Sequence, residues 1–259
     1  MNMNMSGRPV IWKTPSVTED GLKIFACVMM MVQTIGISIV ENGMIHLERY
    51  TQTELSEAMA ADSHLMLLAG GGSVMQLLGG LALPIFAYLL VEGFLNTSSY
   101  RKYLLSIVLF AVVSEIPYDL AMAGKLIDWS SQNALVTMAV CLLMLYFLGM
   151  VKEKKGFAGG AVRLLIVLCA LVWVTLFRAQ YGLCMVLLAA VFYLFYNRNV
   201  LKTVLGVLIS LLYVTGPLAF YGIWCCNEKR TDRLPKYAYY VFYPLHLLFF
   251  GVISTYFMG

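Results

Sequence analysis

Long apolar runs, separated by short polar stretches, follow one another from residue 22 to the end of the chain. A helix needs about 20 mostly apolar residues to cross the hydrocarbon core of a bilayer. Windows of this kind predict membrane-crossing helices at residues 22–44, 74–95, 103–122, 133–151, 161–177, 182–197, 201–226 and 238–258. We therefore expect an all-α fold, a polytopic transmembrane helical bundle of about eight to ten spans.

The polar stretches outside these windows predict how the chain is organised. Residues 1–21 lack the apolar core and the small-residue cleavage site of a secretory signal, so the first span must serve as the insertion signal. Residues 48–63 predict a short interfacial helix, and residues 65–78 a second interfacial or re-entrant piece. We expect a cytoplasmic N-terminal segment, residues 1–21, and one transmembrane domain, residues 22–259.

Composition excludes several classes of protein. Hydrophobic residues make up 61% of the 259 residues and charged residues only 12%, which is too little polar surface for a soluble globular chain. The net charge of +4 is small and scattered, and no nucleic-acid-binding signature is present, so membrane lipids are the expected surroundings. The six cysteines lie within or beside apolar runs and show no metal-ligand spacing; we expect no metal and read them as small buried hydrophobes.

Lysine and arginine in short loops indicate orientation, because cytoplasmic loops carry an excess of both. One side of the predicted bundle collects Arg8, Lys13, Lys23, Arg101, Lys102, Lys152, Lys154, Lys155, Arg163, Arg198 and Lys202. This pattern predicts a cytoplasmic N-terminus in a multi-pass protein of the bacterial inner membrane. One loop disagrees, since simple alternation of spans would place Lys229, Arg230, Arg233 and Lys236 outside. The side of the C-terminus is left open.

Two carboxylates in the third predicted span are candidates for chemistry. Glu115 and Asp119 are four residues apart and share one helix face, close to Gln132 and Asn133 at the start of the next span. Neighbouring carboxylates at a low-dielectric wall suit proton transfer near neutral pH. The alternative is that they cap helix ends or pair with basic residues of nearby loops, and spacing alone favours neither.

The first span carries a polar stripe. Lys23, Thr34, Ser38 and Glu41 recur at helical spacing, which places Thr34 near the middle of the membrane. The structural alternative is that Lys23 reaches the headgroups and Glu41 lies at the opposite interface, while Thr34 only joins helices.

Two further polar positions stand in apolar runs. Glu92 lies at the end of its span near Arg101 and Lys102, where we expect an ion pair with Lys23. His246 lies within a clear span, and histidine is the usual general base near neutral pH, although a lone buried histidine also serves as a hydrogen-bonding group. We expect Glu115, Asp119, Gln132, Asn133 and His246 to converge on one internal cavity.

Several of these stretches together resemble the TraX family. The resemblance is carried in order by Asp20-Gly21-Leu22-Lys23-Ile24, the run from Gly79 to Phe94, Tyr103-Leu104, the run from Ser114 to Leu120, Gln132-Asn133 and the run from Phe242 to Leu248. It covers about residues 20–250. The family is named for the conjugal-transfer protein that acetylates the N-terminus of F-type pilin, and it is similar to the wider membrane acyltransferases.

The resemblance implies a fold, a cofactor and site residues. It implies an acyltransferase-like bundle that uses acetyl-CoA from the cytoplasmic side, with Lys23 at the position of a basic residue near the start of the first span. The Asp-His pair of many members aligns with Gln33-Thr34, and Asn96 stands where members commonly carry histidine. Thr34 cannot act as a base near neutral pH, and Gln33 cannot orient one as a carboxylate would.

Two classes of function follow. The first is a membrane-bound O- or N-acetyltransferase that acts on an unidentified peptide, glycan or lipid acceptor. In that reading His246 or the Glu115 and Asp119 pair supplies the base, with Thr34, Gln132 and Asn133 nearby, and Lys23, Glu92, Arg101 and Lys102 form the cofactor end. The second is a non-catalytic binding or assembly protein that has lost the Asp-His pair. We favour the enzyme, because so many polar residues are retained in the spans.

Overall fold

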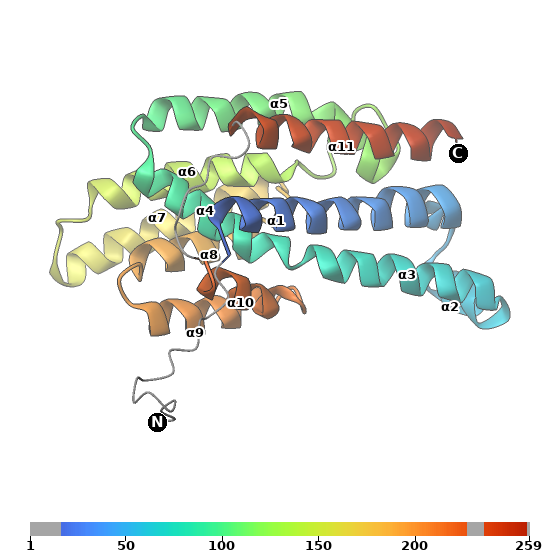
Figure 1. The fold of residues 1–259 in the computed structure, drawn as a ribbon, viewed down its shortest axis with the longest axis horizontal. Coiled ribbons are helices and arrows are strands. Elements are labelled where there is room, and N and C mark those ends of the chain that lie inside the picture. Colours follow the sequence, from blue (N-terminus) through green and yellow to red (C-terminus); the bar gives the residue numbers. More distant parts are fainter. Residues whose placement is uncertain (1–16, 227–235, 258–259) are drawn as a thin grey trace, which may run out of the picture.

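The structure, a computed structural model, describes residues 17–226 and 236–257, and every regular element in these ranges is helical (Figure 1). The elements are α1 (Glu19–Thr34), η1 (Ile35–Ile45), η2 (Leu47–Arg49), α2 (Gln52–Ala61), α3 (Ser63–Gly79), α4 (Ala82–Asn96), α5 (Tyr100–Ala123), α6 (Ala134–Met150), α7 (Gly156–Leu176), α8 (Gly182–Leu194), α9 (Asn199–Ser210), η3 (Gly216–Leu218), α10 (Ala219–Trp224) and α11 (Lys236–Phe257). The predicted all-helical bundle is confirmed.

The lengths and surfaces of these helices are those of a polytopic membrane protein. Within the described ranges, 5 helical stretches are long and apolar enough to cross a membrane, and α6, α8 and α9 are shorter apolar helices. Large apolar side chains cover the outward faces of α5 and α7, among them Leu105, Val112 and Leu164, which are 67%, 71% and 60% exposed. Exposed apolar surface on this scale is typical of helices that face lipid.

The second predicted span is longer than expected. Residues 65–78 do not form a separate piece before it, because α3 continues almost directly into α4 and gives one helical stretch, Ser63–Asn96, of 34 residues. Its α4 half lies at the centre of the bundle against α8, where Ile85, Ala87, Val186 and Leu188 are fully buried. The predicted helix within residues 48–63 is α2, whose first turn is closed by a capping box at Thr51 and Glu54.

The polar stripe of the first span is split between two neighbours. After Thr34 the helix widens into the π-helix η1, which shifts the spacing away from that of an α-helix. Ser38 donates a hydrogen bond to the carbonyl oxygen of Phe250 in α11 (3.1 Å), whereas Glu41 accepts one from Gln76 in α3. Ser38 and Glu41, whose spacing predicted one shared helix face, therefore contact two different helices, α11 and α3.

Contacts along α11 show the direction of the last span. Phe110 of α5 stacks on Tyr240, and Lys23 of α1 lies 5.8 Å from the ring centroid of Tyr239. Farther along, Ser38 reaches Phe250. Helix α11 therefore runs parallel to both α1 and α5, and Figure 1 shows α5 and α11 side by side. The end of α11 lies at the opposite end of the bundle from the start of α1.

The predicted span 201–226 is wrong, because this stretch turns back on itself. Helix α9 has 12 residues and α10 has 6, about 18 Å and 9 Å of rise, against a hydrocarbon core of about 30 Å. The turn needs Gly216, since a Cβ there would lie 2.6 Å from the carbonyl oxygen of Ser210. The backbone N–H of Val17 donates to the carbonyl oxygen of Cys225 (2.8 Å), so α10 ends beside the start of α1.

Because α9 and α10 fold back on each other, the loop with Lys229, Arg230, Arg233 and Lys236 no longer follows a full crossing, which was the basis of its disagreement with the charge pattern. Lys229, Arg230 and Arg233 lie outside the described residues, and Lys236 begins α11. The residues on either side, Cys226 and Tyr237, both lie at the end of the bundle where α1 begins. Counting 201–226 as a full crossing would instead have placed these two flanking residues at the opposite end of the bundle.

Candidate functional site

A cavity of about 450 Å³ opens at the end of the bundle where α1 and α5 begin and extends inward between α1, α4, α5, α6, α8 and α11. Lys23 lines its mouth and Gln33 its inner end. The two residues are ten positions apart, which corresponds to about 15 Å along α1. The inner end therefore reaches about half of the 30 Å hydrocarbon thickness.

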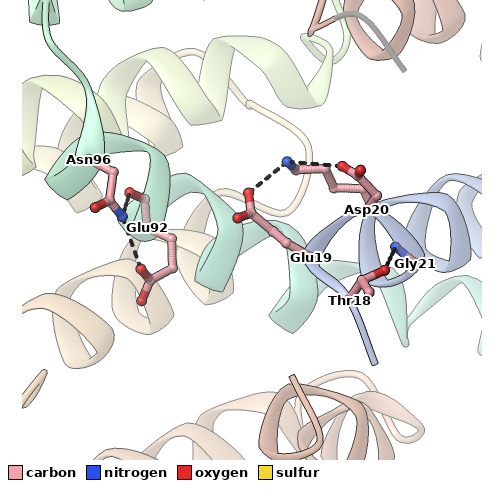
Figure 2. Close-up of polar contacts among 7 residues, drawn as sticks. Thr18, Glu19, Asp20, Gly21, Glu92 and Asn96 are labelled. Carbon is pink, nitrogen blue, oxygen red and sulfur yellow. Dashed lines mark hydrogen bonds and ion pairs between the residues drawn. The ribbon is translucent and has the colours of Figure 1, made fainter. Parts of the chain in front are cut away.

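The mouth combines charged side chains with a helix N-terminus. Lys23 Nζ lies 2.6 Å from Glu19 and 3.9 Å from Asp20 (Figure 2). Thr18 caps α1 by accepting a hydrogen bond from the N–H of Gly21 (3.1 Å), which holds this turn at the mouth. On the other side, Lys102 and the residues 97–99 that precede α5 line the opening. The first N–H groups of a helix attract anions, so this side suits a phosphate.

The predicted cofactor residues divide into two groups. Lys23 and Lys102 line the mouth, whereas Arg101 is exposed next to Lys102 and Glu92 lies outside the cavity lining. Glu92 is 9% exposed and accepts hydrogen bonds from Asn96 (3.3 Å) and from the hydroxyl of Tyr196 (3.4 Å); Figure 2 shows it beside Asn96 on α4. Among the described residues Lys23 pairs with Glu19 and Asp20, so its expected ion pair with Glu92 is wrong.

The inner end of the cavity, which we call the cavity floor, consists of Gln33, Thr137, Gln180, Tyr181 and Tyr243. The hydroxyl of Tyr181 donates to Gln33 Oε1 (2.6 Å), and the hydroxyl of Thr137 donates to the carbonyl oxygen of Gln180 (2.7 Å). Tyr181 has a φ of 60°, a left-handed conformation that is uncommon outside glycine. The floor is therefore built by a tightly constrained turn between α7 and α8.

Behind the floor, two connections are joined by backbone hydrogen bonds. The N–H of Gln132 donates to the carbonyl oxygen of Arg178 (3.2 Å). The N–H of Gln180 donates in turn to the carbonyl oxygen of Gln132 (2.8 Å). Gln132, one of the predicted catalytic residues, thus joins the α5–α6 connection to the α7–α8 connection. In the first of these, the hydroxyl of Ser130 holds the pKa of Asp128 below its usual value.

The other predicted catalytic residues lie between α1, α5, α6 and α11. We call Thr34, Glu115, Asn133 and His246 the interhelical cluster. Asn133 donates to Glu115 and to the carbonyl oxygen of Ala111 (2.8 Å), and its Oδ1 caps α6 by accepting the N–H of Leu135 (3.0 Å). Glu115 Oε1 is buried without a partner among the described residues.

His246 is held by both ring nitrogens. Nδ1 lies 2.9 Å from the carbonyl oxygen of Phe242, so it carries the proton, and Nε2 lies 3.3 Å from the hydroxyl oxygen of Thr34. The ring also packs against Tyr243, with 5.7 Å between centroids. The hydroxyl of Tyr243 accepts a hydrogen bond from the N–H of Ala134 (3.3 Å). Tyr243 therefore stands between the interhelical cluster and the cavity.

The structure brings some predicted residues together and separates others. Glu115 and Asn133 are bonded to each other, as are Thr34 and His246, whereas Asp119 accepts the N–H of Asp128 (2.8 Å) at the end of α5. None of the predicted catalytic residues lines the cavity between α1, α4, α5, α6, α8 and α11. Within the described part of the chain, no group of His, Cys, Asp and Glu is arranged to hold a metal ion.

Sequence reasoning missed most of the cavity floor. The dipeptide Gln180-Tyr181 separates two apolar runs and resembles an ordinary loop, and Thr137 and Tyr243 are single polar groups in apolar helices. Gln33 was visible beside Thr34, but neighbouring residues of a helix point about 100° apart. The helix directs Gln33 into the cavity and Thr34 toward α11.

Comparison with known proteins gives one family and one relative. The family described as TraX protein matches residues 18–254. The probable fimbrial assembly protein FimC, serogroup H1, of Dichelobacter nodosus is 31% identical over 99 residues, which cover 34% of this chain and 41% of that protein. The match thus spans less than half the length of the relative. No solved structure matches the chain.

Proposed function

This chain belongs to the TraX family, and from that premise we propose that it is a membrane acetyltransferase. It transfers the acetyl group of acetyl-CoA to an amine or hydroxyl of a peptide, glycan or lipid acceptor. The acceptor oxygen or nitrogen bonds to the thioester carbonyl carbon, the carbon–sulfur bond breaks, and coenzyme A leaves as the thiol. The name of the fimbrial assembly relative favours a fimbrial subunit as the acceptor.

The observation that carries the proposal is the cavity itself. One continuous space joins a mouth with a lysine and a helix N-terminus to a polar floor at about half the membrane depth. The phosphates of coenzyme A bind at Lys102, Arg101 and the start of α5, and its thioester arm extends past Cys27 and Tyr103 toward the floor. A long ligand fits this cavity if its anionic end binds at the mouth and its reactive carbonyl lies at the floor.

Orientation supports the same assignment. The end that carries the mouth also carries Lys152, Lys154 and Lys155 between α6 and α7, Arg198 just before α9 and Lys202 in the first turn of α9. We propose that this end faces the cytoplasm of a bacterial inner membrane, by the excess of Lys and Arg. Acetyl-CoA is then taken from the cytoplasm, and α11 ends on the opposite side.

His246 is the proposed base. Its Nδ1–H is bonded to the Phe242 carbonyl, so Nε2 is unprotonated and its lone pair faces the hydroxyl of Thr34. A histidine fixed in one tautomer by a second hydrogen bond is the usual arrangement of a general base. Tyr243 lies between His246 and the cavity, and a small shift of this ring admits the acceptor proton to Nε2. Glu115, bonded through Asn133, stabilises the start of α6 next to this position.

One observation favours the non-catalytic alternative. Among the described residues that line the cavity there is no histidine, and its carboxylates, Glu19 and Asp20, belong to the mouth. A binding or assembly protein would keep such a cavity without a base. It would bind its ligand and leave the thioester intact.

The test uses the purified protein in nanodiscs with acetyl-CoA labelled in the acetyl group. We expect binding, and transfer of label to a peptide, glycan or lipid acceptor. Charge reversal of Arg101 and Lys102 to Glu should weaken binding on the order of tenfold at low salt and less at high salt, because exposed ionic contacts are screened. The control reverses Lys154 and Lys155, exposed basic residues at the same end of the bundle. Absence of acetyl-CoA binding contradicts the proposal, and binding without turnover across a broad set of acceptors supports the assembly role.

A further inference from the structure

Gln33 is held in one orientation at the cavity floor by two independent features. The hydroxyl of Tyr181 donates to its Oε1 at 2.6 Å. On the other side Gly79 leaves the space that the side chain occupies, since a Cβ at residue 79 would lie 2.6 Å from Gln33 Cδ. A flexible amide is thus fixed by a hydrogen bond and by a missing side chain.

This orientation leaves the amide nitrogen available. Because Tyr181 takes the oxygen, the two N–H groups of Nε2 point the other way, and within residues 17–226 and 236–257 they donate to no other group. Gln33 lines the cavity, so these donors are open to a ligand. A half-buried amide that uses its acceptor and leaves its donors unused matches a ligand that brings an acceptor.

We propose that Gln33 Nε2 donates a hydrogen bond to the carbonyl oxygen of the acetyl thioester, an inference that rests on the proposed function. Such a donor orients the carbonyl and stabilises the negative charge that develops on its oxygen as the acceptor attacks. Tyr181 and Gly79 are positioning residues that act through Gln33. The site therefore distinguishes acetyl-CoA, which has this oxygen, from free coenzyme A, which does not.

The neutral amide is required for this role. Glutamate at residue 33 would keep the shape but present carboxylate oxygens, which repel a carbonyl oxygen and donate nothing when ionised. Methionine would keep the length and lose both donors. These two substitutions therefore remove the hydrogen bond in different ways and should have the same effect on ligand preference.

The experiment measures the dissociation constants of acetyl-CoA and of free coenzyme A by calorimetry in nanodiscs. Gln33→Met and Gln33→Glu should each weaken acetyl-CoA binding about three- to tenfold, the size of one lost hydrogen bond, and change coenzyme A binding less than about twofold. Gln52→Glu, on the exposed helix α2, is the matched control. Gly79→Ala, which pushes against Gln33, should reproduce the loss, whereas Gly70→Ala, with nothing within 4 Å, should not.

A second readout reports on the carbonyl directly. In infrared difference spectra of acetyl-CoA with a ¹³C-labelled carbonyl, the stretching band should move to lower frequency on binding to the wild type. It should move less with Tyr181→Phe and not at all with Gln33→Met. A band and an acetyl-CoA preference that are unchanged in the Gln33 variants overturn the inference and leave the proposed function intact. A wild-type protein that binds coenzyme A and acetyl-CoA equally also overturns it, whereas failure to bind either ligand removes the proposed function itself.

Discussion

The interhelical cluster and the cavity floor are both polar groups inside an apolar bundle, but they use their hydrogen-bonding groups differently. In the interhelical cluster, Thr34 pairs with His246 and Glu115 with Asn133, so helices are joined to one another. In the cavity floor, the amide nitrogen of Gln33 faces open space. A buried polar group is costly in either place. Burial cost therefore identifies polar groups that must find a partner, but not whether that partner is the protein or a ligand.

The largest expected effect tests whether the interhelical cluster also takes part in chemistry. His246→Gln retains hydrogen-bonding groups but cannot take up a proton near neutral pH. If His246 is the base, the rate of acetyl transfer should fall by about 10²–10⁴, with acetyl-CoA affinity unchanged. His64→Gln, at an exposed position, is the control. An unchanged rate in single-turnover assays would reduce His246 to a helix-joining residue.

The next effect should be on stability. Asn133 is fully buried. Its side chain donates hydrogen bonds to Glu115 and to the carbonyl oxygen of Ala111, and it accepts one from the first turn of α6. Asn133→Leu keeps the branched shape of the side chain but leaves these groups unpaired, so we expect a loss of roughly 3 kcal/mol in the free energy of unfolding. Unfolding in mixed micelles with increasing SDS measures this loss. Asn199→Leu at the exposed start of α9 should have little effect, and equal behaviour of both variants would show that the Asn133 cap contributes nothing special.

The smallest effect concerns a cap outside the membrane. Glu54 accepts the backbone N–H of Thr51 (2.8 Å), and this bond holds the pKa of Glu54 below its ordinary value of 4.5. A lowered pKa means that the cap stabilises α2 above pH 4.5 and is lost as the pH falls through the lower, folded value. Amide hydrogen exchange in the first turn of α2, corrected for intrinsic rates, should therefore increase below that pH.

Glu54→Gln should remove this pH dependence and leave the rest of the bundle unchanged. Glu57→Gln, on the same helix but beyond the capping box, should retain the wild-type profile. Identical profiles for the wild type and Glu54→Gln would contradict the role of the carboxylate. Asn133→Leu and Glu54→Gln thus compare the stabilising effect of a helix cap buried in the bundle with that of a cap exposed to water.

Much of the fold could be read from local pattern. Apolar length identified the long helical stretches at α1, α4, α5, α7 and α11, because the thickness of the hydrocarbon core imposes that length on a crossing helix, and it also located the shorter apolar helices α6 and α8. It failed at residues 201–226, where the apolar run is long enough but Gly216 and Pro217 turn it back beside α1. Hydropathy measures length and composition, and it cannot tell one crossing from two short helices that fold on each other.

The sequence by itself determined that this chain is a helical membrane protein of the TraX family, and it pointed to several of the polar residues that the helices bury. Only the tertiary structure decided what each of them faces. Gln33 and Thr34 are neighbours in the chain, yet one points into the cavity and the other to His246. The space at Gly79 and the hydroxyl of Tyr181, 148 residues away from Gln33, orient the amide. Such contacts depend on how helices pack, which residue spacing within one helix does not specify.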